Sequence, residues 1–364
     1  MRSKSRSIMD RVPFVSILVV NYNGKKHFDE FFNSMFNLEY PKTRYEIVVV
    51  DNGSSDGSVE YLVDKYSEYI KGRRFPKIKI IKLNKNYGFA EGNNIGVNYC
   101  DGEFIALINN DTVVDKYWLS ELIKHAVKDP NAIYGSKMLW YIKKDYIVYH
   151  GGVYLAWGWP LHLKGFEKNS DDQTEQILSV YADGCGMLIS KSLFLKLGGF
   201  DKSYFAYAED YELSWKAWLQ GYRVYFIPTA KFYHKVSSTL GRISPNYIYL
   251  LWRNQLRNII KFVELHNLLI MLPLFILHTI ATYLILLVEG HPLTIIPMIK
   301  AYLKVLSELP TLIEIRREIQ SRRVVRDRDL KKLGLILSFR ESIMKSLDLL
   351  RKRKKFWEVV NGED

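Results

Sequence analysis

The chain has 364 residues, of which 48% are hydrophobic and 25% charged, the proportions of a folded globular protein with one large domain or two ordinary ones. Its two cysteines, Cys100 and Cys185, give no disulfide framework and no metal-ligand spacing, which indicates a reducing compartment. The formal net charge is +13, and residues 316–355 hold fifteen Lys and Arg against five acidic residues. The basic character is therefore a C-terminal property, suited to an anionic membrane surface or a nucleic acid.

The chain opens with "MRSKSRSIMDR", and we expect residues 1–12 to be a flexible basic N-terminus. No apolar segment of the kind found in a signal peptide follows it, because "FVSILVV" runs directly into the polar "NYNG". The sequence thus predicts no cleaved leader and places the first domain on the cytoplasmic side of the membrane.

Short apolar runs that alternate with helical patterns follow over about 130 residues. The runs lie at 14–24, 45–58, 77–84 and 104–111, and the helical patterns at 27–38, 58–70, 89–100 and 116–127. Continuous rather than alternating apolarity indicates strands buried on both faces, as in a parallel sheet covered by helices. The pattern predicts a doubly wound α/β domain.

Each predicted strand ends in amide or carboxylate side chains. They are Asn21 and Asn23, Asp51 and Asn52, Asn84 and Asn86, and Asn109 to Asp111. One such ending is explained by a turn, because Asn and Asp side chains bond to nearby backbone. Ligands of such sheets bind beyond the carboxyl ends of the strands, so four polar endings at one edge predict a binding site.

The pattern loosens between residues 134 and 181, where we expect short strands and a loop that shape an acceptor pocket. Residues 182–228 then predict a strand, a helix from Lys191, a Gly-Gly turn, a helix "DYELSWKAWLQ" that ends at Gly221, and a further strand.

Six motifs together resemble family 2 glycosyltransferases, which have the GT-A fold, and most closely a rhamnosyltransferase-like branch. They are "VSILVVNYNG", "VVVDNGSSDGS", "NKNYGFAEGNNIG", "LINNDTVVD", "GCGMLISKSLFLKLGGFD" and "AEDYELSWKAWLQGYRV", in the order of the family, and they cover roughly residues 14–240. The resemblance implies a GT-A glycosyltransferase domain over 13–245, a nucleotide-sugar donor (a UDP-, GDP- or dTDP-sugar), transfer with inversion, and a divalent metal such as Mn²⁺ or Mg²⁺.

Several of these motif residues are candidates for binding the donor. Asp51 ends the second strand and fits a carboxylate that accepts hydrogen bonds from the base or ribose. "GFAEGNNIG" offers backbone N–H groups at a helix start to a diphosphate, although its spacing is not that of a dinucleotide fingerprint. By resemblance, the nucleotide-sugar site comprises Asn21, Asn23, Asp51, Asn86, Gly88, Asn93, Asn110 and Asp111.

Asp111 is the expected metal ligand, since Mg²⁺ often takes one or two protein carboxylates together with substrate phosphates. The commonest pattern of the family is Asp-x-Asp, and here Asn109 stands at the first position. Asn-Asn-Asp is usual in the branch that the chain resembles, but an amide brings no charge, so metal binding depends more on the donor. His234 is a second candidate near the metal or diphosphate; an isolated histidine is equally compatible with a structural role.

An acceptor hydroxyl must lose its proton to a positioned base before it attacks an anomeric carbon. The resemblance assigns this role to Asp210, with Glu209 assisting or binding the acceptor. Acids at a helix start are also favoured by capping and by the helix dipole. Asp183 and Arg253 are candidates for acceptor or diphosphate contacts, and Arg253 fits a solvated or membrane-facing stripe equally well.

The segment 268–288 has 21 positions without Asp, Glu, Lys or Arg, a length that matches a bilayer core. We predict a helical membrane-associated region over 246–310 and a basic helical tail over 311–364. Basic residues on both sides favour a hairpin that turns near "EGHPL", or interfacial helices, over a single span with a translocated tail. The tail is expected on anionic lipid rather than nucleic acid, because no nucleic-acid recognition module accompanies it.

The sequence thus predicts an inverting, metal-assisted glycosyltransferase at the cytoplasmic face of the cell membrane, acting on a glycan or a lipid-linked acceptor. Two alternatives remain open. A nucleotidyltransferase would usually show a Gly-rich basic loop after the first strand, and "NYNGKKHF" is a poor version of one. A catalytically idle, membrane-anchored sugar-binding or scaffold protein would be free to lose Asp111 or Asp210. Donor sugar, acceptor, linkage and oligomeric state are not set by the sequence.

Overall fold

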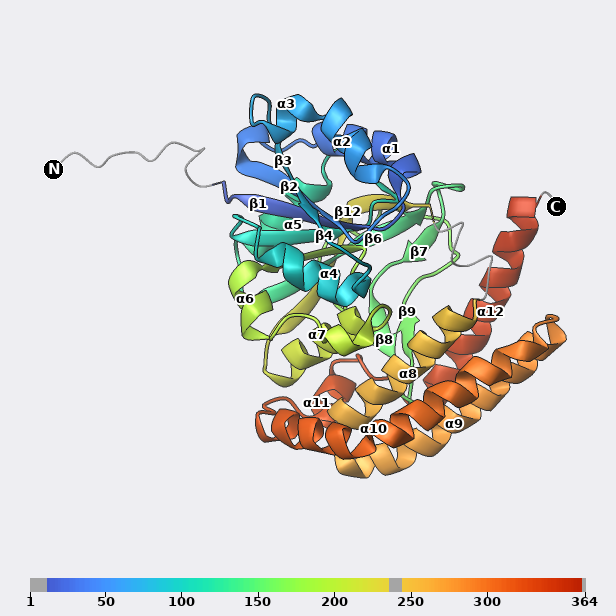
Figure 1. Ribbon diagram of the computed structural model, residues 1–364. Coiled ribbons are helices and arrows are strands. Elements are labelled where there is room, and N and C mark those ends of the chain that lie inside the picture. Colours follow the sequence, from blue (N-terminus) through green and yellow to red (C-terminus); the bar gives the residue numbers. More distant parts are fainter. Residues whose placement is uncertain (1–11, 236–243, 362–364) are drawn as a thin grey trace.

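The computed structural model describes residues 12–235 and 244–361. A ten-stranded sheet lies at its centre with helices on both faces, and the C-terminal helices form a further layer against one side (Figure 1). The predicted flexible N-terminus lies outside the described residues except for Val12.

The N-terminal half of the sheet is parallel in the order β3-β2-β1-β4, with β4 beside β1. The strands are β1 (Val15–Asn21), β2 (Tyr45–Asp51), β3 (Lys77–Lys82) and β4 (Phe104–Ile108), and the helices are α1 (Phe28–Phe36), α2 (Ser58–Lys65), α3 (Ser67–Ile70), α4 (Gly88–Val97) and α5 (Trp118–Ala126). The predicted alternation of strand and helix is confirmed, and every residue of β1, β2 and β4 except Val20 is buried, as continuous apolar runs require.

The second half of the sheet is mixed: β11 runs antiparallel to β4 and to β6, and β12 runs parallel to β6. Its elements are β5 (Thr112–Val114), β6 (Ala132–Trp140), β7 (Ile147–Tyr149), β10 (Ile177–Leu178), β11 (Gly186–Ser190), α6 (Lys191–Lys196), α7 (Glu209–Leu219) and β12 (Arg223–His234). A separate hairpin pairs β8 (Gly152–Tyr154) with β9 (Pro160–His162). Short 3-10 turns lie at Lys25–His27, Lys42–Arg44, Lys202–Tyr204 and Pro292–Thr294.

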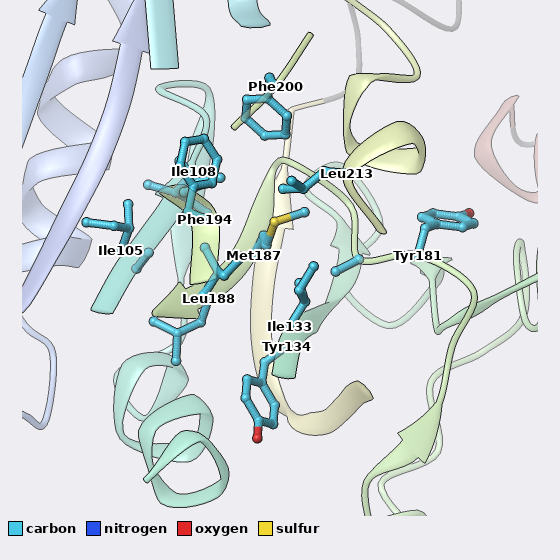
Figure 2. Close-up of a cluster of buried hydrophobic side chains, with 14 of the residues drawn as sticks. Ile105, Ile108, Ile133, Tyr134, Tyr181, Met187, Leu188, Phe194, Phe200 and Leu213 are labelled. Atoms are coloured by element: carbon cyan, nitrogen blue, oxygen red, sulfur yellow. The ribbon is translucent and has the colours of Figure 1, made fainter. Parts of the chain in front are cut away.

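The core continues across the change of strand direction. Ile105 and Ile108 of β4, Met187 and Leu188 of β11, and Ile133 of β6 gather into one buried cluster (Figure 2). Each fully buried aliphatic side chain of this size contributes about 1.5–3 kcal/mol. The cluster holds β4 and β11 rigidly together, and both strands lead into the site described below.

Five helices follow the sheet: α8 (Pro245–Phe262), α9 (Leu265–Val288), α10 (Ile295–Ser321), α11 (Asp327–Lys332) and α12 (Phe339–Asn361). The chain reverses at Gly290, so α9 and α10 form a hairpin, joined by a 2.7 Å hydrogen bond between Thr279 Oγ1 and Tyr302 OH (Figure 1). Among the described residues, α9 alone has the length and apolar composition to cross a membrane, and 17% of its most apolar window is buried.

These C-terminal helices pack against the sheet domain through specific hydrogen bonds. The segment 335–337 pairs with Tyr154 of β8, with N–H to carbonyl distances of 2.8 and 2.9 Å. Arg316 donates to the carbonyls of Ile260 and Val263 at the end of α8, both at 2.6 Å. Part of the basic tail is therefore used to satisfy the last carbonyls of a helix.

Candidate active site

The ends of β1, β2 and β4 are joined by a network of buried polar side chains. Asn21 donates to Asp51 Oδ1 at 2.9 Å and to Ser54 Oγ at 3.1 Å, and Asn110 donates to Asn21 Oδ1 at 2.6 Å. Asp51 also accepts from the backbone N–H of Ser54 at 3.2 Å. Asn21 and Asp51 are fully buried, so these side chains shape the edge of the sheet by bonding to one another.

The turn after β1 needs its glycine for a steric reason. A Cβ at Gly24 would lie 1.9 Å from Asn110 Nδ2 and 2.5 Å from Asn21 Oδ1. The adjacent Asn23 is exposed at φ 52°, and its side-chain oxygen accepts from the N–H of Ser55 at 2.8 Å. The predicted candidates Asn21, Asn23 and Asn110 thus lie together.

A second network positions the start of α4. Asn52 donates to Asn86 Oδ1 at 3.1 Å and to the carbonyl of Gly88 at 2.9 Å, and Asn86 accepts from the N–H of Gly88 at 2.8 Å. Asn93 is buried and donates back to the carbonyl of Phe89 within the helix. Asn86 and Gly88 therefore lie at the helix start where a diphosphate was predicted, whereas Asn93 faces inward.

Asp111 and His234 are brought together by the pairing of β5 with the end of β12. His234 Nε2 lies 3.0 Å from Asp111 Oδ1, yet neither atom is aligned for a hydrogen bond, and His234 Nδ1 also lacks a partner. Burial favours the neutral imidazole, but the adjacent carboxylate outweighs it and raises the pKa of His234 above its ordinary value. Burial likewise opposes ionisation of Asp111, and His234 outweighs it and lowers the pKa of that carboxyl.

This pair fits a divalent cation. A buried carboxylate oxygen and a ring nitrogen that lack hydrogen-bond partners are ligands that Mn²⁺ and Mg²⁺ sites use, completed by oxygens of a diphosphate. Among the described residues no three His, Cys, Asp or Glu side chains gather into one metal site, so a cation held by this pair would need further ligands from outside it. Asn109 stands at the position of the first carboxylate of the Asp-x-Asp pattern, and its amide nitrogen donates to Cys185 Sγ at 3.2 Å.

Three carboxylates lie close by at the start of α7 and before β11. Asp210 accepts from the N–H of Gly184 at 2.9 Å, and Asp183 accepts from the N–H of Cys185 at 2.9 Å. Burial, reinforced by the charge of Asp183, raises the pKa of Asp210 to about 7. Burial and the neighbouring Asp210 raise the pKa of Glu209 well above its ordinary value, and Glu209 Oε2 has no partner. A carboxyl group with a pKa of about 7 can both accept and release a proton near neutral pH.

The loop that leads into these acids is strained. Phe205, Tyr207 and Ala208 have φ values of 64°, 70° and 67°, a region that residues with a side chain rarely adopt. Each such residue costs about 1–3 kcal/mol and persists only where surrounding contacts hold it. Gly88 closes on this loop from α4, where a Cβ would lie 2.3 Å from the carbonyl oxygen of Phe205.

Buried side chains of α8 hold the strained loop in place. Asn254 Nδ2 lies within 3.1 Å of the carbonyls of Tyr204, Ala206 and Tyr207, and Asn258 donates to the carbonyl of Ala208 at 3.2 Å. Arg253 donates to the carbonyls of Ser203 and Tyr204 at 2.8 and 3.1 Å. The structure therefore places Arg253, a predicted acceptor or diphosphate contact, in this backbone clamp.

One cavity of about 590 Å³ unites the chemistry-bearing residues. Of the predicted site residues it is lined by Asp111, Asp183, Glu209, Asp210 and His234. The donor-side candidates lie outside its lining: Asn21, Asn23, Asp51, Asn86 and Asn110 at or just after strand ends, and Gly88 and Asn93 in α4. Arg253 of α8 also lies outside it. A second hollow of about 760 Å³, around Glu121 and Lys231, shares none of these residues.

Sequence reasoning did not predict two features of the site. The clamp residues Asn254 and Asn258 occur four positions apart in "WRNQLRN". This spacing puts both amides on one face of a helix and could have indicated a polar face that packs against another segment. Trp159 and Leu161 of the cavity wall lie in the segment 134–181, from which an acceptor pocket was expected, whereas the contribution of Leu349 from the C-terminal tail has no local signal.

Comparison with known proteins identifies the class. Residues 16–198 match the sequence profile of glycosyl transferase family 2, which is half of the chain, and the chain therefore belongs to that family.

Three curated relatives illustrate the range of the family. An inactive polypeptide N-acetylgalactosaminyltransferase-like protein 5 of Macaca fascicularis is 25% identical over 66% of this chain and 57% of its own. A poly-beta-1,6-N-acetyl-D-glucosamine synthase of Staphylococcus aureus is 25% identical over 68% of this chain and 54% of its own. An uncharacterized glycosyltransferase of Haemophilus influenzae is 30% identical over 33% of this chain and 35% of its own. The chain spans less than two thirds of the length of each of these relatives.

Solved structures support the GT-A fold class. GalNAc-T7 with UDP, GalNAc and Mn²⁺ superposes with a TM-score of 0.55 at 19% identity, over 69% of this chain and 48% of that chain. The mannosyltransferase PcManGT from Pyrobaculum calidifontis, in complex with GDP-Man and Mn²⁺, superposes with a TM-score of 0.53 at 15% identity, over 85% and 86%. The expected α/β fold of the GT-A class, a central sheet flanked by helices and followed by a C-terminal helical region, is confirmed.

Proposed function

We propose that this protein is an inverting glycosyltransferase that moves a sugar from a nucleoside-diphosphate-sugar to a hydroxyl group of an acceptor. The observation that carries the proposal is the shared cavity, in which the Asp111–His234 pair and the Asp210 carboxylate face one space. A transferase of this kind needs a place for the departing diphosphate and a base for the incoming hydroxyl, and the cavity provides candidates for both.

Asp210 takes the proton of the acceptor hydroxyl as its oxygen forms a bond to the anomeric carbon. The bond from that carbon to the diphosphate oxygen breaks on the opposite face, so the configuration inverts. Burial and the neighbouring Asp210 raise the pKa of Glu209 well above its ordinary value, and its Oε2 atom, which has no partner among the described residues, hydrogen-bonds to the acceptor. Asp183 reinforces the raised pKa of Asp210 by its charge.

Asp111 and His234 would hold a divalent cation, Mn²⁺ or Mg²⁺, in this scheme. When bound, the cation stabilises the negative charge of the departing nucleoside diphosphate. Asn21, Asn23, Asp51, Asn86, Gly88, Asn93 and Asn110 frame the neighbouring donor side, where UDP-, GDP- and dTDP-sugars are the donor classes to be distinguished. Mn²⁺ in the two structural neighbours, with UDP in one and GDP-mannose in the other, supports this assignment.

We also propose that the protein works at the cytoplasmic face of the cell membrane on a lipid-linked or glycan acceptor. The outward faces of α9 and α10 carry exposed apolar side chains, among them Leu269, Ile270, Leu277, Leu303 and Leu306. Apolar faces of this kind suit interfacial helices, and the exposed basic residues of α11 and α12 suit anionic headgroups rather than nucleic acid. The rhamnosyltransferase-like branch is supported by the Asn109-Asn110-Asp111 motif alone.

Calorimetric titration of the detergent-solubilised chain with UDP, GDP and dTDP tests the proposal, each with Mn²⁺ or Mg²⁺ and then with EDTA. We expect metal-dependent binding of one nucleotide, weakened at least about tenfold in Asp111→Ala and retained in Asp210→Ala. If a folded protein binds none of the three nucleotides, the proposal fails and the idle scaffold takes its place.

A further inference from the structure

The cavity that contains Asp210 is lined by two kinds of side chain. One set is titratable: Asp111, Asp183, Glu209, Asp210 and His234. The rest of the lining is mainly aromatic and aliphatic, with Met138, Trp140, Val148, Trp159, Pro160, Leu161, Phe166, Leu251 and Leu349. We refer to this apolar set as the apolar arm. Because both sets line the same cavity, one molecule can contact both.

The walls of the apolar arm come from the catalytic sheet and from the C-terminal helices. Trp140 ends β6 and Leu161 lies in β9, whereas Leu251 belongs to α8 and Leu349 to α12. A Cβ at Gly165 would lie 3.3 Å from Leu349, which shows how closely α12 covers the loop after β9. The arm therefore exists only because the C-terminal helices pack against the glycosyltransferase domain.

The arm backs directly onto the apolar helix α9. Trp159 packs against Phe275 and His278 of α9, with ring centroids 5.9 and 4.9 Å apart. Leu161 belongs to an apolar cluster that also includes Leu274 of α9 and Leu349 of α12. Since the opposite face of α9 is exposed and apolar, the arm lies beside the surface expected to meet lipid.

The apolar arm is a poor binding site for a sugar, because sugar hydroxyls buried against hydrocarbon side chains would lack hydrogen-bond partners. The cavity volume of about 590 Å³ is within the range of sites that bind a whole small molecule, about 300–1,000 Å³. Besides atoms of Asp111, Glu209 and His234, two lining atoms are buried without hydrogen-bond partners among the described residues, the donor Trp140 Nε1 and the acceptor Gln255 Oε1. This combination fits an amphipathic ligand with a long apolar chain.

We propose that the apolar arm binds the hydrocarbon chain of a lipid-linked acceptor while the hydroxyl-bearing head lies at Asp210. This inference rests on the proposed function and deepens it, because it selects a lipid-linked acceptor over a soluble glycan. It also assigns α12 a role in the site: Leu349 closes the arm, and Phe356 holds the helix against Trp140 with ring centroids 4.8 Å apart.

Photolabelling of the full chain in detergent tests this inference, with farnesyl monophosphate that carries a diazirine at the end of its chain as the probe. We expect labelled peptides from residues 159–166 and 345–350. Leu349→Trp should fill the arm and reduce labelling at least about tenfold, whereas Leu347→Trp, on an exposed position of the same helix, should leave it unchanged. Unlabelled farnesyl phosphate should compete, and phosphatidylglycerol should not.

Labels confined to the exposed faces of α9 and α10, or labelling insensitive to Leu349→Trp, would overturn the inference. Equal competition by phosphatidylglycerol would overturn it as well, because the arm would then hold bulk membrane lipid. Nucleotide titration of the same samples confirms that the variants are folded and separates the two proposals. Nucleotide binding without labelling of the arm contradicts the lipid-chain inference alone, whereas absence of nucleotide binding contradicts the transferase proposal itself.

Discussion

The proposed donor and acceptor sides of the site differ in how far their buried polar groups are hydrogen-bonded within the protein. On the donor side, Asn21, Asp51, Ser54 and Asn110 satisfy one another through hydrogen bonds of 2.6–3.2 Å and are supplied by turns that directly follow strands. On the acceptor side, Glu209 Oε2 has no partner and Asp210 is buried beside a second carboxylate.

The difference separates residues that shape the site from residues that react. Satisfied buried polar groups fix geometry and contribute to stability, whereas buried carboxylates beside like charges are unfavourable in the folded state and are retained where chemistry requires them. The strained backbone at Phe205, Tyr207 and Ala208 belongs to the same side. Substitutions on the acceptor side should therefore reduce turnover more than they reduce donor binding.

The largest effect is expected for Asp210→Asn, which keeps the size of the side chain and removes its basicity. Turnover, measured as release of nucleoside diphosphate from the donor that titration identifies, should fall about 10²–10⁴-fold. Nucleotide affinity should not change, since Asp210 lies away from the donor-side networks. Asp64→Asn, at an exposed carboxylate on α2, is the control. Turnover within a factor of two of the wild type would remove Asp210 from the mechanism.

His234→Ala should reduce turnover on the order of 10²-fold, because the cation would lose one of its two protein ligands. Metal titration in the presence of nucleotide should show weaker Mn²⁺ binding than in the wild type. His266→Ala, at an exposed position at the start of α9, should behave as the wild type does. Unchanged metal affinity in His234→Ala would assign the imidazole to a structural role.

Asn254→Ala should reduce turnover about tenfold by releasing the strained loop, because three carbonyls lose their shared donor. Asn254 is a positioning residue, so the midpoint of the pH–rate profile should also move as Asp210 becomes more accessible to water. Asn246→Ala, exposed on the same helix, is the matched control. A loss of turnover with an unmoved midpoint would indicate a merely structural contribution.

The smallest effect concerns stability, and its sign follows from the raised pKa of Asp210. Between pH 3.8, the ordinary pKa of an aspartate, and about 7, the folded chain keeps a proton that the unfolded chain releases. The contribution of this carboxylate to the free energy of unfolding therefore falls as pH rises through that window. Above the window the loss stays constant. Asp210→Asn should raise Tm by a few degrees at pH 8 and by less at pH 5. An equal Tm difference at both pH values would contradict the raised pKa.

The donor side could be predicted from the sequence because each of its residues lies next to the apolar run that forms its strand. Continuous apolar runs predicted β1, β2 and β4, and the polar residues that end them predicted the edge where Asn21, Asp51 and Asp111 lie. The convergence of Asp111 with His234 followed only from the family resemblance, since the residues are joined by the pairing of β5 with β12. The placement of the whole acceptor side depends on tertiary contacts.

The family resemblance predicted Asp183, Glu209 and Asp210, and an acceptor pocket was expected from residues 134–181, but the contacts that complete the acceptor side join residues distant in sequence. Asn254 reaches the carbonyl of Tyr207 across 47 positions, and Leu349 joins a wall that otherwise comes from residues 138–166 and 251. Arg253 carried a charge that suggested a phosphate contact, and it instead donates to backbone carbonyls. The basic tail was expected to meet lipid throughout, but Arg316 caps α8. The sequence showed that Arg253 and Arg316 are charged, but it could not show which groups they contact.

The role of Asp210 as the base is tested most directly by the pH dependence of kcat/KM for donor turnover, with water or lipid as acceptor. Burial and the charge of Asp183 raise the pKa of Asp210 to about 7. The rate should therefore rise tenfold per pH unit below a midpoint of about 7 and level off above it. A profile that is flat from pH 5.5 to pH 8, in a protein that binds its nucleotide across that range, would contradict it.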